Sequence, residues 1–212
     1  MKQLASLILI LFSWNSGSAQ TEEFQPAGSF KAEIGLANNL SNVAFSDLMQ
    51  GLFNITAGYQ YTLPNSLSFG AGVRHNYFTV NQFKNNNDLR GGIHFGGVYG
   101  KIGIEKYYGQ FGIDIGVRVG YNMIASATNK CKEANEGLTL FDGGFIEPVI
   151  NLGLLADERS SFYLNLTYAL HTIKFNPYHV CEDDFSAYSP EGLDKITTYF
   201  VIGFGYSFYF GK

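Results

Sequence analysis

The sequence predicts an all-β fold, an eight-stranded antiparallel up-and-down transmembrane β-barrel. Three observations lead to this prediction: a composition rich in glycine and aromatic residues but poor in charge, apolar side chains that recur with a period of two, and connections that alternate between short and long. The period-two segments that we interpret as strands are residues 29–40, 52–63, 66–80, 92–106, 110–126, 143–156, 161–175 and 196–211.

The composition excludes several classes of protein. Of the 212 residues, 15% are charged, 16% are aromatic and 25 are glycine, whereas soluble domains carry roughly 25% charged residues. This mixture favours strands over helices. A net charge of −4 without a basic cluster argues against a nucleic-acid partner. Beyond the N-terminal segment there is no run of about 18 apolar residues, which excludes a membrane protein built from helices.

The N-terminus has the features of an export signal. Lys2 precedes a short apolar run, and Gly17 and Ala19 lie at the −3 and −1 positions of a cleavage site. We therefore expect residues 1–19 to be a cleaved signal peptide and residues 20–212 to form the barrel. A membrane anchor is the alternative, but the run is shorter than the ~20 residues that a spanning helix needs.

The connections between the strands alternate strictly in length. In an up-and-down sheet, this alternation places all short turns at one end and all long loops at the other, with both termini at the short-turn end. Bacterial outer-membrane barrels have this layout, with short periplasmic turns and long extracellular loops. The short turns are residues 64–66, 107–109 and 157–160, and the long loops are residues 41–51, 81–91, 127–142 and 176–195.

Alternation along the strands also separates two faces of different size. In the last strand, Phe204 and its even-numbered neighbours are bulky and apolar, whereas Gly203, Gly205 and Ser207 are small. Eight strands enclose only enough room for packed side chains, so we expect the small face to line the lumen and the bulky face to contact lipid. The alternative is that the bulky residues form the core of a soluble protein.

The fourth strand is the least regular. Around Gly96 and Gly97 the two-residue period is ambiguous. Because an extra residue in one strand interrupts the alternation of faces, we predict a β-bulge at this point.

Charged residues on the small face predict a polar network inside the barrel. Asp114 and Arg118 lie four residues apart on one strand, roughly 13 Å at ~3.3 Å per residue, so each needs a partner on another strand. Buried charges require such partners, which favours a salt-bridged interior; a gated path for ions or protons is the alternative. The expected network contains Arg74, Arg118, Glu147 and His171 near mid-depth, Glu33 and Asp114 together nearer the short turns, and Lys31.

The two cysteines lie in different long loops, Cys131 in the third and Cys181 in the fourth. Two cysteines in an exported protein suggest a disulfide, and both loops belong to the same end of the barrel. We therefore predict a bond between Cys131 and Cys181 that rigidifies the loops, with two free thiols as the alternative.

The sequence offers no catalytic motif, and we predict that the protein is not an enzyme. His171 belongs to no recognisable triad, and His75 and His94 are isolated in the sequence. The segment HVCEDDF, residues 179–185, has one histidine, one cysteine and three acids, which falls short of a zinc pattern. An acidic, solvated loop is favoured there over a divalent-cation site. We expect no metal and no cofactor.

The final strand carries a short motif in which a glycine precedes two aromatic residues, at Gly205, Phe208 and Phe210. With this motif and the barrel layout, residues 20–212 resemble the small eight-stranded outer-membrane barrels, the class of the OmpA membrane domain, OmpX and OmpW, and most of all the "outer membrane protein beta-barrel" families of Bacteroidota. The chain departs from the motif at Gly203, where a polar residue is usual. The resemblance implies a Gram-negative outer membrane, recognition by the barrel-assembly machinery, and contact with outer-membrane lipid and lipopolysaccharide.

These features predict a porin-like barrel with a filled lumen, periplasmic termini and extracellular long loops. Its expected role is in envelope structure, in surface interaction or as an accessory subunit of an outer-membrane complex. Loop aromatics such as Phe45, Phe83 and Tyr188 are candidates for contacting other envelope proteins. Two alternatives remain: an OmpW-like channel for small solutes or apolar ligands, and a barrel enzyme that modifies lipid A.

Overall fold

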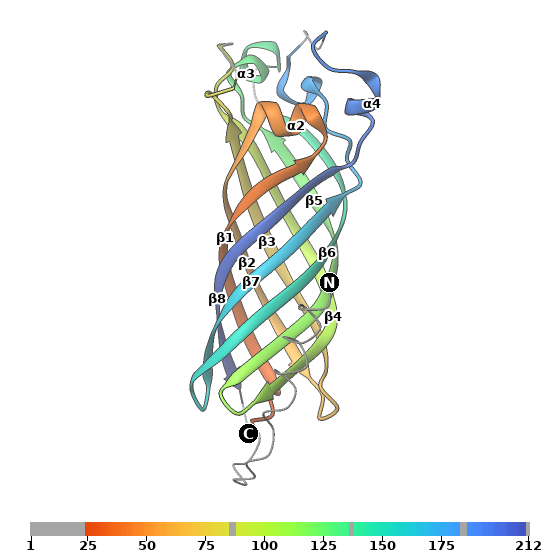
Figure 1. Ribbon diagram of the computed structural model, residues 1–212. Coiled ribbons are helices and arrows are strands. Elements are labelled where there is room, and N and C mark those ends of the chain that lie inside the picture. Colours follow the sequence, from red (N-terminus) through yellow and green to blue (C-terminus); the bar gives the residue numbers. More distant parts are fainter. Residues whose placement is uncertain (1–23, 85–87, 136–137, 183–185, 211–212) are drawn as a thin grey trace, which may run out of the picture.

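Eight antiparallel strands close into a barrel in the order β1 to β8, with β8 paired to β1 (Figure 1). This confirms the eight-stranded up-and-down barrel that the sequence predicts. The computed structural model describes residues 24–84, 88–135, 138–182 and 186–210, so the expected signal peptide, residues 1–19, lies outside the described residues. The strands are β1 (Gly28–Ser41), β2 (Met49–Thr62), β3 (Leu67–Val80), β4 (Gly92–Tyr108), β5 (Phe111–Ser126), β6 (Thr139–Asp157), β7 (Ser160–His171) and β8 (Thr197–Phe210).

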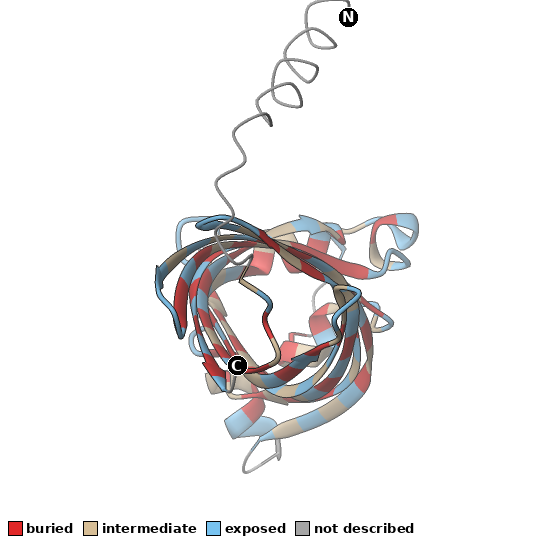
Figure 2. Ribbon diagram, turned by 90° about the horizontal axis from the view of Figure 1, so that it is seen from below, coloured by how far each residue is buried: buried red, intermediate tan, exposed pale blue. Residues whose placement is uncertain are grey.

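Side chains alternate between the inside and the outside of the barrel. In β8, Val201 and Ser207 are buried, whereas Phe204 is 70% exposed, and Figure 2 shows the same alternation of buried and exposed residues around the barrel. The bulky face therefore points outward, as expected. Each strand contributes large apolar residues to this outer surface, for example Ile34, Ile55, Val73, Ile102, Val119, Ile150, Phe162 and Phe204.

Glycines on the inner face make room for large side chains in the lumen. A Cβ atom at Gly205 would overlap the ring of Tyr163, and one at Gly112 would overlap the ring of Tyr107. Because eight strands enclose little space, these tyrosines fit only where the facing position has no side chain. The glycines of the inner face thus provide the space that its large side chains occupy.

The predicted bulge in β4 is wrong. β4 keeps an unbroken register with β3 and β5 through Gly96 and Gly97. Phe95 and Tyr99 are both buried in the lumen, so the two-residue period continues across the glycines, which conceal it in the sequence because they carry no side chain. The register instead shifts between Asn39 and Ser41, between Gly51 and Phe53, and between Leu155 and Asp157.

The short turns lie at one end of the barrel, the short-turn end, and the long connections lie at the other, the long-loop end (Figure 1). β1 starts at the short-turn end, where Gly28 pairs with Phe210 of β8. Within the described residues, none of the helices is long and apolar enough to cross a membrane. The helices, which the sequence pattern does not distinguish from loops, all lie in the long connections: α2 (Val43–Leu48), α3 (Asn129–Asn135), the 3-10 helix η1 (Pro177–Val180) and α4 (Pro190–Leu193).

Three strand boundaries at the long-loop end differ from the expected ones by three or more residues, and one of them is the start of β2 at Met49, before the expected residue 52. β6 begins at Thr139, before the expected residue 143, and β7 ends at His171, before the expected residue 175. After His171 the chain leaves the sheet, and the ring of Phe175 packs against Phe45 with centroids 5.2 Å apart. Burial of Phe175 against α2 thus replaces further strand pairing.

An apolar plug, which we define as Phe45, Phe78, Phe95 and Phe175, closes the long-loop end of the lumen. All four side chains are buried, and the ring centroid of Phe45 lies 4.9 Å from that of Phe78. Asn42 holds α2 over this plug, because its Oδ1 accepts from the Phe45 amide and its Nδ2 donates to the Phe175 carbonyl at 2.8 Å. The expectation that Phe45 is a loop aromatic available to partners is therefore wrong, since it turns into the barrel.

The plug makes a testable contribution to stability. Phe45→Ala should lower the free energy of unfolding by about 3–5 kcal/mol, because truncation leaves a cavity among the other three rings. Phe83→Ala is the control, since Phe83 is 95% exposed and its loss should change little. Urea unfolding in detergent micelles, followed by circular dichroism, measures both variants. Equal and small effects would show that the plug does not stabilise the barrel.

Candidate functional site

The candidate site is the interior of the barrel, where buried charges cancel. All seven residues of the expected network, Lys31, Glu33, Arg74, Asp114, Arg118, Glu147 and His171, are buried there, and Lys101 and Glu105 join them. Among the described residues, four cations thus face four acids in the lumen: Lys31, Arg74, Lys101 and Arg118 against Glu33, Glu105, Asp114 and Glu147.

The sequence pattern does not indicate Lys101 and Glu105 as lumen residues, because they follow the glycines of β4. The alternation of inward and outward side chains after those glycines could have indicated both residues. Tyr99, Lys101 and Glu105 are buried, whereas Ile102 and Ile104 are exposed on the outer surface. When the two-residue alternation is followed backward from the end of β4, where the side chains are large, it places both charged side chains in the lumen.

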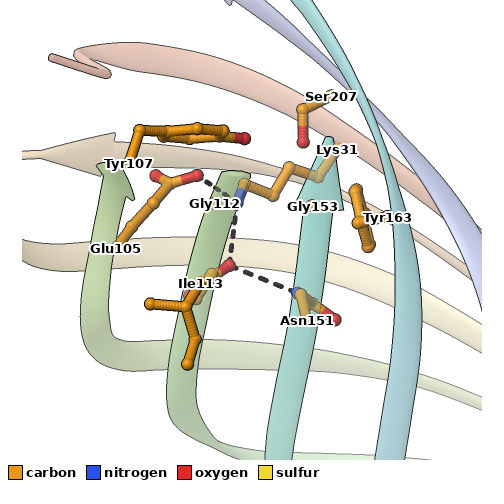
Figure 3. A pocket seen from close by; sticks show the side chains of 10 residues that line it. Lys31, Glu105, Tyr107, Gly112, Ile113, Asn151, Gly153, Tyr163 and Ser207 are labelled. Atoms are coloured by element: carbon orange, nitrogen blue, oxygen red, sulfur yellow. Dashed lines mark hydrogen bonds and ion pairs between the residues drawn. The ribbon is translucent and has the colours of Figure 1, made fainter. Parts of the chain in front are cut away.

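In the half of the lumen nearer the short turns, two lysines neutralise two carboxylates. Lys31 Nζ donates to Glu105 Oε1 at 2.7 Å (Figure 3). It also donates to Asp114 Oδ2 at 2.8 Å. Lys101 Nζ donates to the same Asp114 carboxylate at 2.6 Å and to Gln60 Oε1 at 2.7 Å. A cavity of about 10 Å³ lies beside these groups, roughly the room that a single water molecule needs.

Nearer the plug, two arginines pair with two glutamates. Arg118 pairs with Glu33, and Arg74 pairs with Glu147. The Arg74 guanidinium also donates to the hydroxyl of Tyr199. Each guanidinium therefore has a carboxylate partner on another strand.

The position of Glu33 along the barrel axis differs from the expected one. Asp114 and Arg118 find partners on other strands, as expected, but Glu33 was expected beside Asp114 and instead pairs with Arg118. Asp114 is neutralised by Lys31 and Lys101. The strands of a barrel are tilted and staggered, so residue counts along separate strands do not give a common height.

His171 lies between this network and the plug and forms no catalytic arrangement. Its Nε2 lies 3.1 Å from Tyr199 Oη, and its Nδ1 lies 3.2 Å from Asn122 Nδ2. Its ring stacks on Phe145. A hydrolytic site needs a nucleophile beside the base and a group that orients it, and neither Tyr199 nor Asn122 completes such a set. These contacts indicate a packed interior position.

Aromatic residues cover the lumen at the short-turn end. The hydroxyls of Tyr107 and Tyr209 lie 2.6 Å apart, and the ring of Phe24 contacts both rings with centroids 5.0 Å apart. Seen from this end, the segment that precedes β1 crosses the mouth of the barrel (Figure 2). Tyr209 also bonds Glu105 at 3.1 Å, which connects this cover to the charged network.

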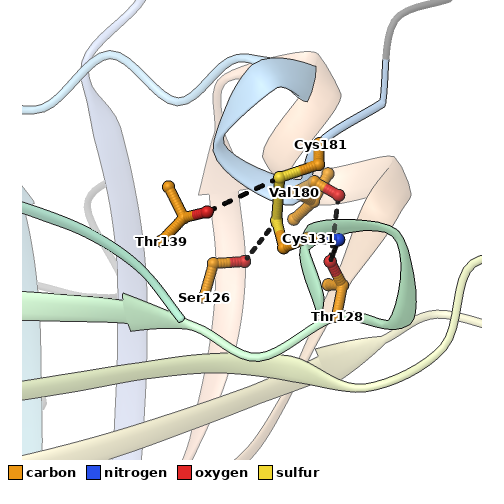
Figure 4. The surroundings of a disulfide bond; sticks show 6 residues. All are labelled: Ser126, Thr128, Cys131, Thr139, Val180 and Cys181. Carbon is orange, nitrogen blue, oxygen red and sulfur yellow. Dashed lines mark hydrogen bonds between the residues drawn. A yellow bond between two sulfur atoms is a disulfide. The ribbon is translucent and has the colours of Figure 1, made fainter. Parts of the chain in front are cut away.

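At the long-loop end, a disulfide joins Cys131 of α3 to Cys181 after η1, with Cα atoms 5.0 Å apart (Figure 4). Thr128 Oγ1 donates to the Val180 carbonyl at 3.0 Å beside it. Lys130 Nζ pairs with a Glu182 oxygen at 2.6 Å. The disulfide and these polar contacts thus hold the third and fourth long loops together.

The residues of segment 179–182 are occupied by contacts within the loops. The ring of His179 stacks on Phe141 with centroids 4.2 Å apart, and burial lowers the pKa of this imidazole. Cys181 is in the disulfide and Glu182 is in an ion pair, while residues 183–185 lie outside the described residues. Within the described part of the chain, no group of three or more histidine, cysteine, aspartate or glutamate side chains could hold a metal ion.

The C-terminal motif lies at the short-turn end. Gly205 is buried beneath Tyr163, whereas Phe208 and Phe210 point outward with ring centroids 5.2 Å apart. The two rings are therefore on the outer surface of the barrel.

Comparisons with known proteins identify structures of the same fold but no relative by sequence. No family model and no curated protein matches the chain. Neisserial surface protein A is 8% identical, with a TM-score of 0.56 over 86% of this chain and 97% of that protein. A major outer membrane protein from Thermus thermophilus is 12% identical, with a TM-score of 0.52 over 87% of this chain and all (100%) of that protein. The chain therefore has the fold of the small eight-stranded outer-membrane β-barrels.

Proposed function

We propose that this protein is a small, non-enzymatic integral outer-membrane barrel whose lumen is closed and which acts in envelope structure or surface interaction through its long loops. The observation that carries the proposal is the filled lumen. Its charges cancel in pairs, the plug covers them at the long-loop end, and Phe24, Tyr107 and Tyr209 cover them at the short-turn end.

The outer surface supports a membrane location. A span through lipid must satisfy every backbone group internally, and a closed barrel does so. Aromatic residues point outward near both ends of the strands, with Phe208 and Phe210 at the short-turn end and Tyr121 and Tyr168 towards the long-loop end. By the usual layout of such barrels, the short turns face the periplasm and the long loops face the outside.

The pairing of the charges favours a closed barrel over a channel. A conducting path needs groups that bind an ion loosely enough to release it. Lys31 and Lys101 instead donate to carboxylates at 2.6–2.8 Å, and the plug above Arg74 and Arg118 offers an ion only apolar rings.

The long loops present a braced surface to partners. The disulfide and the Lys130–Glu182 pair join two loops, and the large side chains of Phe83 and Tyr178 are 95% and 59% exposed. A pre-organised loop loses less conformational entropy on binding. These features support other envelope proteins or lipopolysaccharide as partners of the long-loop end.

Conductance tests the closed lumen directly. The refolded protein in planar lipid bilayers should give no steady openings across a range of voltages, because the charges of the lumen are paired and the plug rings are buried at its long-loop end. Insertion is checked in parallel by protease protection of the strands. Reproducible openings of one size from the inserted protein would overturn the closed-barrel proposal in favour of the channel.

A second test breaks one lumen ion pair. Arg74→Met should lower the free energy of unfolding by about 3–5 kcal/mol, since it leaves Glu147 buried without its cation. The double variant R74M/E147Q should recover part of this loss. As a control, Lys84→Met breaks an exposed pair with Asp47 and should cost less than about 1 kcal/mol. Denaturant unfolding in micelles compares the three variants. Equal losses of unfolding free energy for Arg74→Met and Lys84→Met would contradict the role of the network in stability.

A third test addresses membrane assembly. Replacing both Phe208 and Phe210 with serine should block insertion while export continues, because the change removes the proposed assembly signal. Phe111→Ser is the control, since it alters an outward aromatic that is 70% exposed and outside the final strand. Cleavage of the loops by protease added to intact cells measures insertion. Normal surface levels of the double variant would refute the assignment.

A further inference from the structure

Two histidines that are isolated in the sequence meet on the outer surface of the barrel. His75 lies on β3 and His94 lies on β4, and the register places Tyr77 opposite His94. The two imidazole rings lie 5.4 Å apart, with His94 Nδ1 3.4 Å from His75 Nε2. Phe53 contacts the ring of His75, and Tyr77 contacts the ring of His94, at centroid distances of 5.7 and 4.6 Å.

The two imidazoles are joined by a single long hydrogen bond, which a shared ligand could replace. Only one proton can lie between the two facing nitrogens, and 3.4 Å is longer than the roughly 2.7–3.2 Å of an ordinary hydrogen bond. Protonation of both rings would place two cations against each other. A polar group without a good partner on a largely apolar surface is costly. A shared ligand would satisfy both nitrogens at once.

The distance between the nitrogens matches a metal ion. Two imidazole nitrogens bound at about 2.0–2.1 Å to one tetrahedral ion lie about 3.3–3.4 Å apart, and the observed separation is 3.4 Å. Imidazole is a preferred ligand of Zn²⁺ and Cu²⁺. We propose that His75 Nε2 and His94 Nδ1 form a surface site for a divalent transition metal ion, with its open positions taken by water.

The surroundings leave room for the ion and its waters. Gly96 pairs with His75 across the β3–β4 ladder, and a Cβ atom there would meet only a carbonyl oxygen at 3.9 Å. The site lies towards the long-loop end, because His94 is near the start of β4, which begins at Gly92. This inference goes beyond the proposed function and does not depend on whether the lumen is closed.

Cu²⁺ is the probe for the experiment, because paramagnetic resonance counts its nitrogen ligands. Tag-free protein in detergent micelles should bind one Cu²⁺ ion with the signature of two imidazole nitrogens. His75→Ala and His94→Ala should each weaken binding, measured by equilibrium dialysis, at least about tenfold, the lower limit seen when even a supporting group of a metal site is lost. Circular dichroism and heat-modifiable migration confirm that each variant is folded.

His179→Ala is the matched control, since His179 lies in the loops and stacks on Phe141; it should bind Cu²⁺ as the unchanged protein does. His75→Gln gives a second, conservative test, because it keeps a polar side chain of similar size but removes the imidazole, and it should lose the two-nitrogen signature. Unchanged affinity in folded His75→Ala and His94→Ala, or a Cu²⁺ signal without two imidazole nitrogens, would overturn the proposal.

Discussion

The cancellation of charge inside the barrel is the constraint on which the rest of the structure depends. An unpaired ion in a dry interior costs several kcal/mol, and this lumen has room only for packed side chains. The pairs therefore bridge strands: Arg74–Glu147 joins β3 to β6, and Lys31–Asp114 joins β1 to β5. Because a slip of one residue would turn a lumen charge outward, the pairs specify the strand register while they fill the interior.

Much of the fold could be predicted from the sequence because a barrel imposes local demands. Alternation of Phe204 with Gly203 and Gly205 indicates which face is inside without knowledge of any other strand. The lengths of the connections indicate which ends of the strands share a side. Prediction failed where the local signal was absent: Gly96 and Gly97 carry no side chain, so the phase of β4 was lost there.

The arrangement of the site could be predicted only in part, because it depends on relations between strands. The inward direction of Glu33 follows from its own strand, but its partner Arg118 follows from the stagger of the whole barrel. Phe45 looks like any loop aromatic until the Asn42 cap turns α2 over the lumen. His75 and His94 become neighbours only through the pairing of β3 with β4.

The charged network and the plug, which together fill the interior, come from different segments of the chain. This separation is relevant to the proposed function. The strands alone supply the charged network, whereas the plug needs Phe45 and Phe175 from the long connections. Exposed side chains of the long connections, such as Phe83, belong to neither the network nor the plug, so we expect substitutions at such positions to leave the lumen filled. The disulfide adds a further restraint, since it fixes two loops to each other and not to the strands. Under the proposed function, such a barrel would hold the binding surface of its long loops at a fixed place in the membrane.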